Sequence, residues 1–300
     1  MITSLSLAAY AACVAWAGPR VLVRASRLHR APVLAVAVWL ALGLSFALAV
    51  MLTLYGLAMP SEHLHIVVVD LLRSCGVHGG SVSAAADRFA LLWPAGVLAA
   101  LLACLGCRLA VNRRARARHR HAVDLVGRHV AELGVTVLPY DLPAAYCLPG
   151  RGSRIVVTDA ALRRLTPAQL GAVLEHERGH IAGRHHLVLA VTDAFRYVFR
   201  GVPLAREIHQ QTHALLEMAA DDRALRTHGR DALAGALVEL ARAATPKGAL
   251  AASGHTAMLR MRRILGPQHR PHLFLRAGMT VAAGTTPLVP LVIACGVQAG

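Results

Sequence analysis

The sequence predicts a mainly α integral membrane protein, in which four transmembrane helices carry an α+β domain inserted between the third and the fourth helix. Hydrophobic residues make up 56% of the 300 residues, charged residues only 16%, and the mean hydropathy is +0.50. Soluble globular domains contain about 25% charged residues, so this composition indicates a chain with much of its surface in lipid. The same figures exclude disordered, collagen-like and coiled-coil proteins.

Four apolar stretches each approach the roughly 20 residues that a helix needs to cross a bilayer. They cover residues 2–18, 32–59, 89–111 and 277–297. The first is not expected to be a signal peptide, because Met1–Ser4 carries no positive charge and the arginines follow the apolar run. The predicted organisation is therefore a membrane region over 1–111, a polar domain over 112–276 and a fourth transmembrane helix within 277–300.

The distribution of arginines predicts the orientation in the cell membrane. The loop 19–31 has four arginines and no acid, the stretch 112–120 has five arginines, and the loop 60–88 has a net charge of −1. Positively charged loops stay in the cytoplasm. We therefore expect both termini and the loop 60–88 outside, and the domain 112–276 in the cytoplasm. The basic run Arg113–Arg120, at the end of a span, favours anionic lipid over nucleic acid as its contact.

Turn and cap residues predict the elements of the polar domain in order. A strand is expected over 134–138, and a hairpin over 144–148 and 154–158 around the turn cluster Pro149–Ser153. Thr166, Pro167 and Gln169 predict a capping box that starts a helix through the 170s and 180s. Two further helices are expected, from about 203 to before Gly229 and over 231–244.

The first of these helices carries the motif His176-Glu177-Arg178-Gly179-His180. Histidines four residues apart lie on one helix face and can share one zinc ion, and the intervening Glu177 can reach the zinc-bound water as a general base. His185 and His186 follow one turn later and are expected to face solvent or lipid headgroups, with a role in catalysis as the less favoured alternative.

The next helix supplies a second acidic pair, Glu217 and Asp221, again four residues apart on one face. A catalytic zinc takes three protein ligands, so Glu217 is the expected third ligand. Asp221 would then accept the other ring N–H of a ligand histidine. The spacing of His209, His213 and Glu217 leaves an alternative in which His213 replaces Glu217. Tyr197, His209 and His213 are candidate donors to the transition state, and the sequence does not choose among them.

The motif pair His176-Glu177-x-x-His180 and Glu217-x-x-Ala220-Asp221 resembles the gluzincin metallopeptidases. Three spans, a zinc domain and a fourth span are similar to the layout of the BlaR/MecR family of sensor-transducer peptidases. The resemblance implies one Zn²⁺ held by His176, His180 and Glu217, with Glu177 as the catalytic base and Asp221 behind the ligands. It also implies that substrate binds as an added strand along an edge near Ile155, Val156, Val157 and Thr158.

The implied substrate is a cytosolic winged-helix transcriptional repressor, cleaved in signal transduction, with self-cleavage and a homodimer left open. The sequence departs from the antibiotic sensors of that family in one respect. Their penicillin-binding domain needs the motif Ser-x-x-Lys, but the sole lysine here, Lys247, has Ala244 three residues before it. The resemblance is therefore not expected to extend to that sensor domain. Two alternatives remain, a quality-control protease of the HtpX type and a non-catalytic scaffold that keeps zinc for folding. HtpX-type enzymes carry membrane spans between the two zinc motifs. In this sequence the only apolar segment of that interval is Leu187–Phe199, which has thirteen residues and contains Asp193 and Arg196, so it is too short and too charged to cross a membrane.

Overall fold

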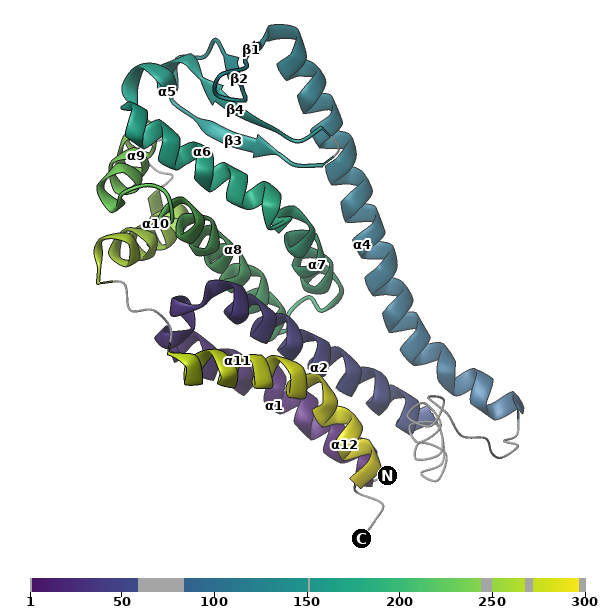
Figure 1. The fold of residues 1–300 in the computed structure, drawn as a ribbon. Helices are drawn as coiled ribbons and strands as arrows, with labels where there is room; N and C mark the ends of the chain where they lie inside the picture. The colour runs from purple at the N-terminus through teal and green to yellow at the C-terminus, as the bar shows by residue number, and fades with distance from the viewer. Residues whose placement is uncertain (1, 59–83, 151, 244–249, 268–271, 297–300) are drawn as a thin grey trace. The chain divides into compact units, whose positions relative to one another are not determined.

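The computed structural model describes residues 2–58, 84–150, 152–243, 250–267 and 272–296 (Figure 1). Most of the predicted external loop 60–88, with Cys75, lies outside these ranges, as do Lys247 and the last four residues. The chain divides into two compact units. Unit 1 comprises residues 1–106, 191–212 and 271–300, and unit 2 comprises 107–190 and 213–270. The sequence analysis sets its boundaries at residues 111 and 276 and keeps 191–212 within the polar domain, whereas in the structure 191–212 belongs to unit 1.

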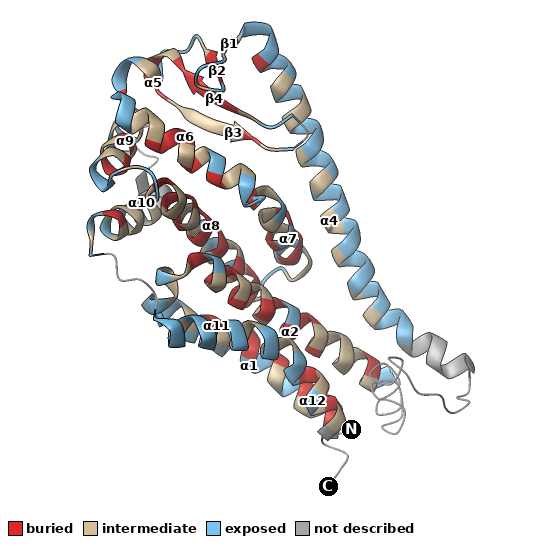
Figure 2. Ribbon diagram, viewed as in Figure 1, coloured by how far each residue is buried: buried red, intermediate tan, exposed pale blue. Residues whose placement is uncertain are grey.

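Four helical segments of the model are long and apolar enough to cross a membrane. They are Ile2–Arg24, Pro32–Ala58, Leu91–Val126 and Leu273–Cys295. Bulky apolar side chains along them remain exposed, among them Leu92 and Trp93 at 62% and 64%. Figure 2 shows exposed residues along most of the length of α4. Because such exposure is costly in water, these helices support a membrane protein.

Helices α1 and α2 form the centre of unit 1. The order is α1 (Ile2–Arg24), η1 (Ser26–Arg30), α2 (Pro32–Ala58), α11 (Leu273–Thr285), η2 (Thr286–Leu288) and α12 (Val289–Gly296). Both α1 and α2 contact α12, and α2 also contacts α11. Leu7, Tyr55 and Ala294 form one buried cluster, and Tyr10 Oη lies 2.7 Å from Ser45 Oγ. The end of the chain therefore packs on its beginning.

The helix ends differ from the predicted spans in three places. Helix α1 runs six residues past the predicted end at 18 and includes Pro19. Helix α4 (Ala84–Val126) has no break at 111 and continues through the basic run as one 43-residue helix. The last span is interrupted by η2, which contains Pro287. Proline lacks the N–H that an α-helix needs, so a short 3₁₀ turn at this point has a local cause.

Unit 2 contains a mixed four-stranded sheet in the order β1-β2-β4-β3. The strands are β1 (Arg128–Val130), β2 (Val135–Leu138), β3 (Ala145–Leu148) and β4 (Arg154–Thr158). Strands β3 and β4 form the predicted antiparallel hairpin, with Tyr146 opposite Val156. The turn between them places Gly152 at φ 68°, a conformation that favours glycine. Strand β4 is also paired in parallel with β2, so it lies inside the sheet.

Alternating residues of the sheet contact different helices. Val135, Val137, Ile155 and Val157 pack with Val173 and Leu174 of α6 and with Ala236 of α9. Val156, which points to the opposite face, packs with Val123 near the end of α4. This alternation follows from the two-residue period of a strand.

Six further helices lie within the described residues. They are α5 (Asp159–Arg164), α6 (Pro167–Ala182), α7 (His185–Val198), α8 (Pro203–Ala224), α9 (Arg230–Ala243) and α10 (Leu250–Leu265). The predicted capping box of α6 is confirmed: Gln169 N–H donates to Thr166 Oγ1 at 3.3 Å, and Thr166 N–H donates to Gln169 Oε1 at 2.9 Å. Helix α10 has no counterpart in the sequence predictions.

Thr166→Ala should destabilise unit 2 by about 1 kcal/mol, because it removes one acceptor for the free N–H groups of the first turn of α6. Gln169→Ala should cost less, and the double variant should cost less than the sum, since the two side chains act reciprocally. Denaturant unfolding of the detergent-solubilised protein, followed by circular dichroism, measures all three. If the losses of unfolding free energy of the two single variants add up to that of the double variant, the two side chains do not act reciprocally, and the capping box would be contradicted.

Candidate metal centre

Helices α6 and α8 cross at unusually small residues, and this crossing brings the two predicted motifs together. A Cβ built on Gly179 would lie 3.2 Å from Ala220 Cα and 3.4 Å from Ala220 Cβ. Any larger residue at either position would hold the helices further apart. Gly179 lies between the two motif histidines, and Ala220 lies between Glu217 and Asp221. The small residues at both motif positions therefore set the distance across which a metal could be held.

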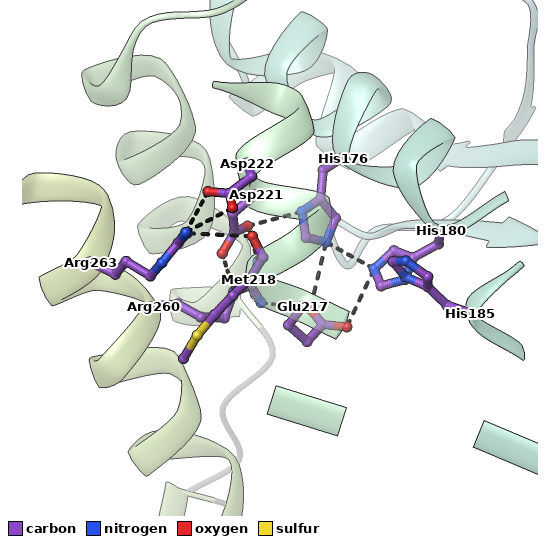
Figure 3. A network of polar contacts seen from close by, with 9 residues as sticks. All are labelled: His176, His180, His185, Glu217, Met218, Asp221, Asp222, Arg260 and Arg263. Atoms are coloured by element: carbon purple, nitrogen blue, oxygen red, sulfur yellow. Dashed lines mark hydrogen bonds and ion pairs between the residues drawn. The ribbon is translucent and has the colours of Figure 1, made fainter. Parts of the chain in front are cut away.

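Three side chains at this crossing can hold one metal ion. Ligand atoms of His176, His180 and Glu217 all lie within 4.8 Å of one another. The two Nε2 atoms are 3.1 Å apart, and Glu217 lies 3.6 Å from His176 and 3.3 Å from His180 (Figure 3). Two imidazoles and a carboxylate form a donor set that suits zinc and leaves a fourth position for water. The donor set therefore fits the metal that the sequence predicts.

Asp221 lies behind this group and is almost completely buried, with 1% of its surface exposed. Its Oδ1 is 3.0 Å from His176 Nδ1, although the direction of the contact is not ideal for a hydrogen bond. A histidine that binds metal through Nε2 carries its proton on Nδ1, where Asp221 can accept it. This is the position that the sequence analysis expects for Asp221.

Arg260 of α10 is a component of the site that the sequence analysis missed. Its guanidinium donates two hydrogen bonds to Asp221, at 2.8 and 2.7 Å, and one to Glu217, at 2.8 Å (Figure 3). Next to it, Arg263 donates to Asp222 at 2.8 Å. Helix α10 thus supplies positive charge beside three carboxylates of α8, of which Asp221 is buried. No sequence spacing signals this contact, because 39 residues separate Arg260 from Asp221.

His185 is also part of the cluster, contrary to its predicted surface position. The residue is 7% exposed, and its Nδ1 lies 2.8 Å from His180 Nδ1. A His180 ring that uses Nε2 for metal can donate its Nδ1 proton to His185. Each ligand histidine therefore has its own partner, a carboxylate for His176 and an imidazole for His180.

The buried charges shift the pKa values of the three candidate ligands. Burial disfavours the charged form of His176, but Asp221 and Glu217 outweigh this and raise its pKa to about 9. Burial likewise opposes ionisation of Glu217, yet His176 and Arg260 lower its pKa to about 2. Burial lowers the pKa of His180 to about 4. Before zinc binds, His176 is therefore the candidate ligand that is a protonated, positively charged imidazolium at neutral pH, whereas His180 is neutral.

Glu177 lies next to the exposed edge of the sheet. Its pKa is raised mainly by burial, which makes the carboxylate a stronger base. The Cys147 thiol of β3 forms a hydrogen bond with Glu177, and burial together with this carboxylate raises the pKa of the thiol to about 12. The thiol therefore stays protonated and donates to Glu177, which connects the base to β3.

Several other predicted residues are not members of the group of three candidate ligands. His213 is on the exposed side of α8 and is not among the three grouped ligands. His209 and Tyr197 belong to unit 1, where His209 Nδ1 lies 3.4 Å from Asp193. The predicted substrate strand Ile155–Thr158 is β4, which pairs with β2 and β3 and has no free edge. Within the described residues the exposed edge nearest Glu177 is β3, because β3 pairs with β4 alone.

Comparison with known proteins supports a peptidase. The model of peptidase family M48 matches residues 110–246, a segment that contains His176, Glu177, His180, Glu217 and Asp221. No curated protein and no solved structure matches the chain. The match does not single out the sensor-transducer family, and it ends before α10 with Arg260. The segment 110–246 is thus similar to the M48 metallopeptidases, and the His-His-Glu group is compatible with their metal dependence.

Zinc affinity should increase about tenfold per pH unit from about pH 5 to about pH 9, and level off above that range. The reason is that zinc must displace one proton from His176, whose pKa is about 9, while His180 and Glu217 are already deprotonated above pH 5. Competition with a chelator of known protonation gives the affinity, and calorimetry in buffers of different ionisation enthalpy counts the proton. An affinity that is constant between pH 6 and 8 would contradict this prediction.

Arg260→Met should destabilise zinc-stripped protein by roughly 3–5 kcal/mol, because it removes the guanidinium that pairs with both Asp221 and Glu217 and leaves protonated His176 as the cation beside the buried Asp221 carboxylate. Arg260→Lys should retain part of the stability, since an ammonium cannot reproduce the two-pronged contact. Arg262→Met, on the exposed side of the same helix, is the matched control and should change stability by less than about 0.5 kcal/mol. Equal effects of the variants at 260 and 262 would show that the contact is not stabilising.

Proposed function

We propose that this protein is a membrane-anchored zinc endopeptidase that cleaves a cytosolic protein. The observation that carries the proposal is the convergence of His176, His180 and Glu217 within 4.8 Å, with Glu177 directly after the first ligand. The match to peptidase family M48 over the same residues supports it. The four apolar helices support the membrane anchor, and the arginine distribution supports a cytoplasmic domain.

The chain's own residues account for the steps of peptide hydrolysis around the metal. Zinc, when bound, would polarise the scissile carbonyl and acidify the attacking water. Glu177 accepts the proton of that water and delivers it to the leaving amine. His185 and Asp221 lie beside Nδ1 of His180 and of His176, which would leave both Nε2 atoms available to a zinc ion. Arg260 donates to Glu217 Oε2, which lies 3.6 Å from His176 Nε2, and Glu217 Oε1 lies 3.3 Å from His180 Nε2.

The substrate would extend along β3 as an added strand. Thr158 N–H donates to Ala144 O, and hydrogen-bonded pairs alternate along an antiparallel ladder. Residues 144, 146 and 148 therefore direct their backbone groups at β4, and Ala145 and Cys147 direct theirs at the free edge. The Cys147 side chain contacts Glu177, so a peptide on this edge would pass the general base.

The resemblance to the BlaR/MecR family suggests a winged-helix transcriptional repressor as substrate, and hence a role in signal transduction. The quality-control alternative receives less support, because the HtpX type carries spans between its zinc motifs. Here the interval contains α7, which has only 14 residues and is not among the candidate spans. A non-catalytic scaffold would keep the ligands but would not require Glu177 beside the β3 edge.

Glu177→Gln should abolish proteolysis and leave zinc content at about one ion per chain, because the amide cannot accept the proton but is not a ligand. Glu175→Gln makes the same change two residues away and is the control. Glu175 is paired with Arg223 at 2.7 Å and with Arg178 at 3.2 Å and not with the candidate ligands, so this variant should retain proteolysis. Comparative proteomics of cells with each variant identifies substrates that accumulate only with Glu177→Gln. A repressor among them supports signalling, misassembled membrane proteins support quality control, and no difference would support the scaffold.

Ala145→Pro should reduce kcat/KM for a protein substrate by at least about tenfold, because it removes a backbone N–H from the exposed edge. The β3–β4 ladder should survive, since Ala145 does not pair its N–H with β4 in this register. Ala145→Val is the control for side-chain bulk and should leave kcat/KM within about threefold. Unchanged cleavage by folded, zinc-loaded Ala145→Pro would exclude β3 as the binding edge.

A further inference from the structure

Unit 1 contains a basic cavity that the proposed peptidase chemistry does not use. The cavity has a volume of about 320 Å³ and lies between the end of α1 and the first turn of α8. Arg20 and Arg24 of α1 and Arg206 of α8 line it, with Glu207 as the acidic residue of the lining. We call it the arginine cleft. Three arginines against one glutamate give its lining a net charge of +2.

A second cavity, of about 290 Å³, adjoins the arginine cleft and shares Pro203 and Arg206 with it. Arg196 and Arg200 also line this cavity, and its lining contains no acid. All five arginines of the two cavities are exposed. Among the described residues, Arg206 is the member with an ion-pair partner, Glu207 at 3.3 Å. The combined lining therefore attracts an anion, because most of its charge is not neutralised within the protein.

The start of α8 adds to this positive potential. Helix α8 has 22 residues and begins at Pro203, which lines both cavities. The amino end of a helix carries a partial positive charge and N–H groups without acceptors inside the helix. Here that end is combined with five guanidinium groups, and arginine is well suited to phosphate because its donors match two phosphate oxygens at once.

The apolar part of the lining indicates where the anion comes from. Trp16 and Val23, also in the lining of the arginine cleft, are 51% and 44% exposed. Both residues belong to α1, one of the candidate membrane spans. Tryptophan beside arginine at the end of a span is typical of the headgroup level of a bilayer. A soluble phosphate would leave the apolar surfaces of Trp16 and Val23 in contact with water, whereas the first carbons of an acyl chain would cover them.

We propose that the arginine cleft binds the phosphate of an anionic phospholipid, with its glycerol backbone and upper acyl chain against Trp16 and Val23. The site selects lipids by charge, since a zwitterionic headgroup would bring a cation close to the arginines. Each arginine near an anionic lipid contributes roughly a fivefold increase in affinity. The proposal does not depend on peptidase activity.

The test is binding of one lipid to the full-length, delipidated protein, followed by native mass spectrometry. Dioleoyl phosphatidylglycerol should bind at least about tenfold more tightly than dioleoyl phosphatidylcholine. The triple variant Arg20→Gln, Arg24→Gln, Arg206→Gln should lose on the order of 100-fold in affinity for phosphatidylglycerol. The triple variant Arg128→Gln, Arg164→Gln, Arg226→Gln removes the same charge from exposed positions of unit 2 and should bind like the wild type.

Three outcomes would overturn the proposal: equal binding of the two lipids, unchanged binding by the first triple variant, or soluble glycerol phosphate that binds as tightly as phosphatidylglycerol. The last outcome would assign the cleft to a soluble phosphate compound. If the first variant does not fold, a photoreactive benzoylphenylalanine at position 23 replaces it. It should crosslink to phosphatidylglycerol in mixed vesicles more than the same group at position 5, near the other end of α1, and equal crosslinking would contradict the site.

Discussion

The candidate metal centre depends on one buried carboxylate, Asp221. A carboxylate with 1% exposure is stable only if positive or hydrogen-bonding groups surround it, because the loss of hydration is costly. Here His176 of α6 and Arg260 of α10 provide them. The same contacts join three helices that are distant in sequence. The orientation of a ligand histidine and the packing of α10 on α8 are therefore two effects of one electrostatic requirement.

Much of the site could be predicted from the sequence because its chemistry is local. Ligands four residues apart on a helix need only the helical period, and the capping box of α6 needs only three residues. The contribution of Arg260 could not be predicted, since it depends on how α10 packs after a long interval, and arginines are too common in this chain to be distinctive. His185 was misplaced for a related reason: a histidine one turn past a motif looks the same in sequence whether the helix axis continues or turns.

The fold shows the same division between local and long-range information. The hairpin of β3 and β4 follows from its turn residues, but the parallel pairing of β2 with β4 is long-range. That pairing places β4 inside the sheet and leaves β3 as the edge beside Glu177. The apolar stretches predicted four spans, yet the length of α4 was underestimated, because a change from apolar to basic composition does not end a helix. Helix α4 ends instead just before Gly127, where a side chain would collide with Val123 O.

The position of Arg260 after both zinc motifs in the chain has a consequence for synthesis. A ribosome completes both zinc motifs well before α10 emerges, so for a time the nascent chain contains every ligand but lacks the cation that allows Asp221 to be buried. During that interval hydration of the Asp221 carboxylate opposes its burial between α6 and α8, because Arg260 is not yet present to pair with it. Assembly of the metal centre therefore depends on a third helix, α10, as well as on the two helices that carry the candidate ligands.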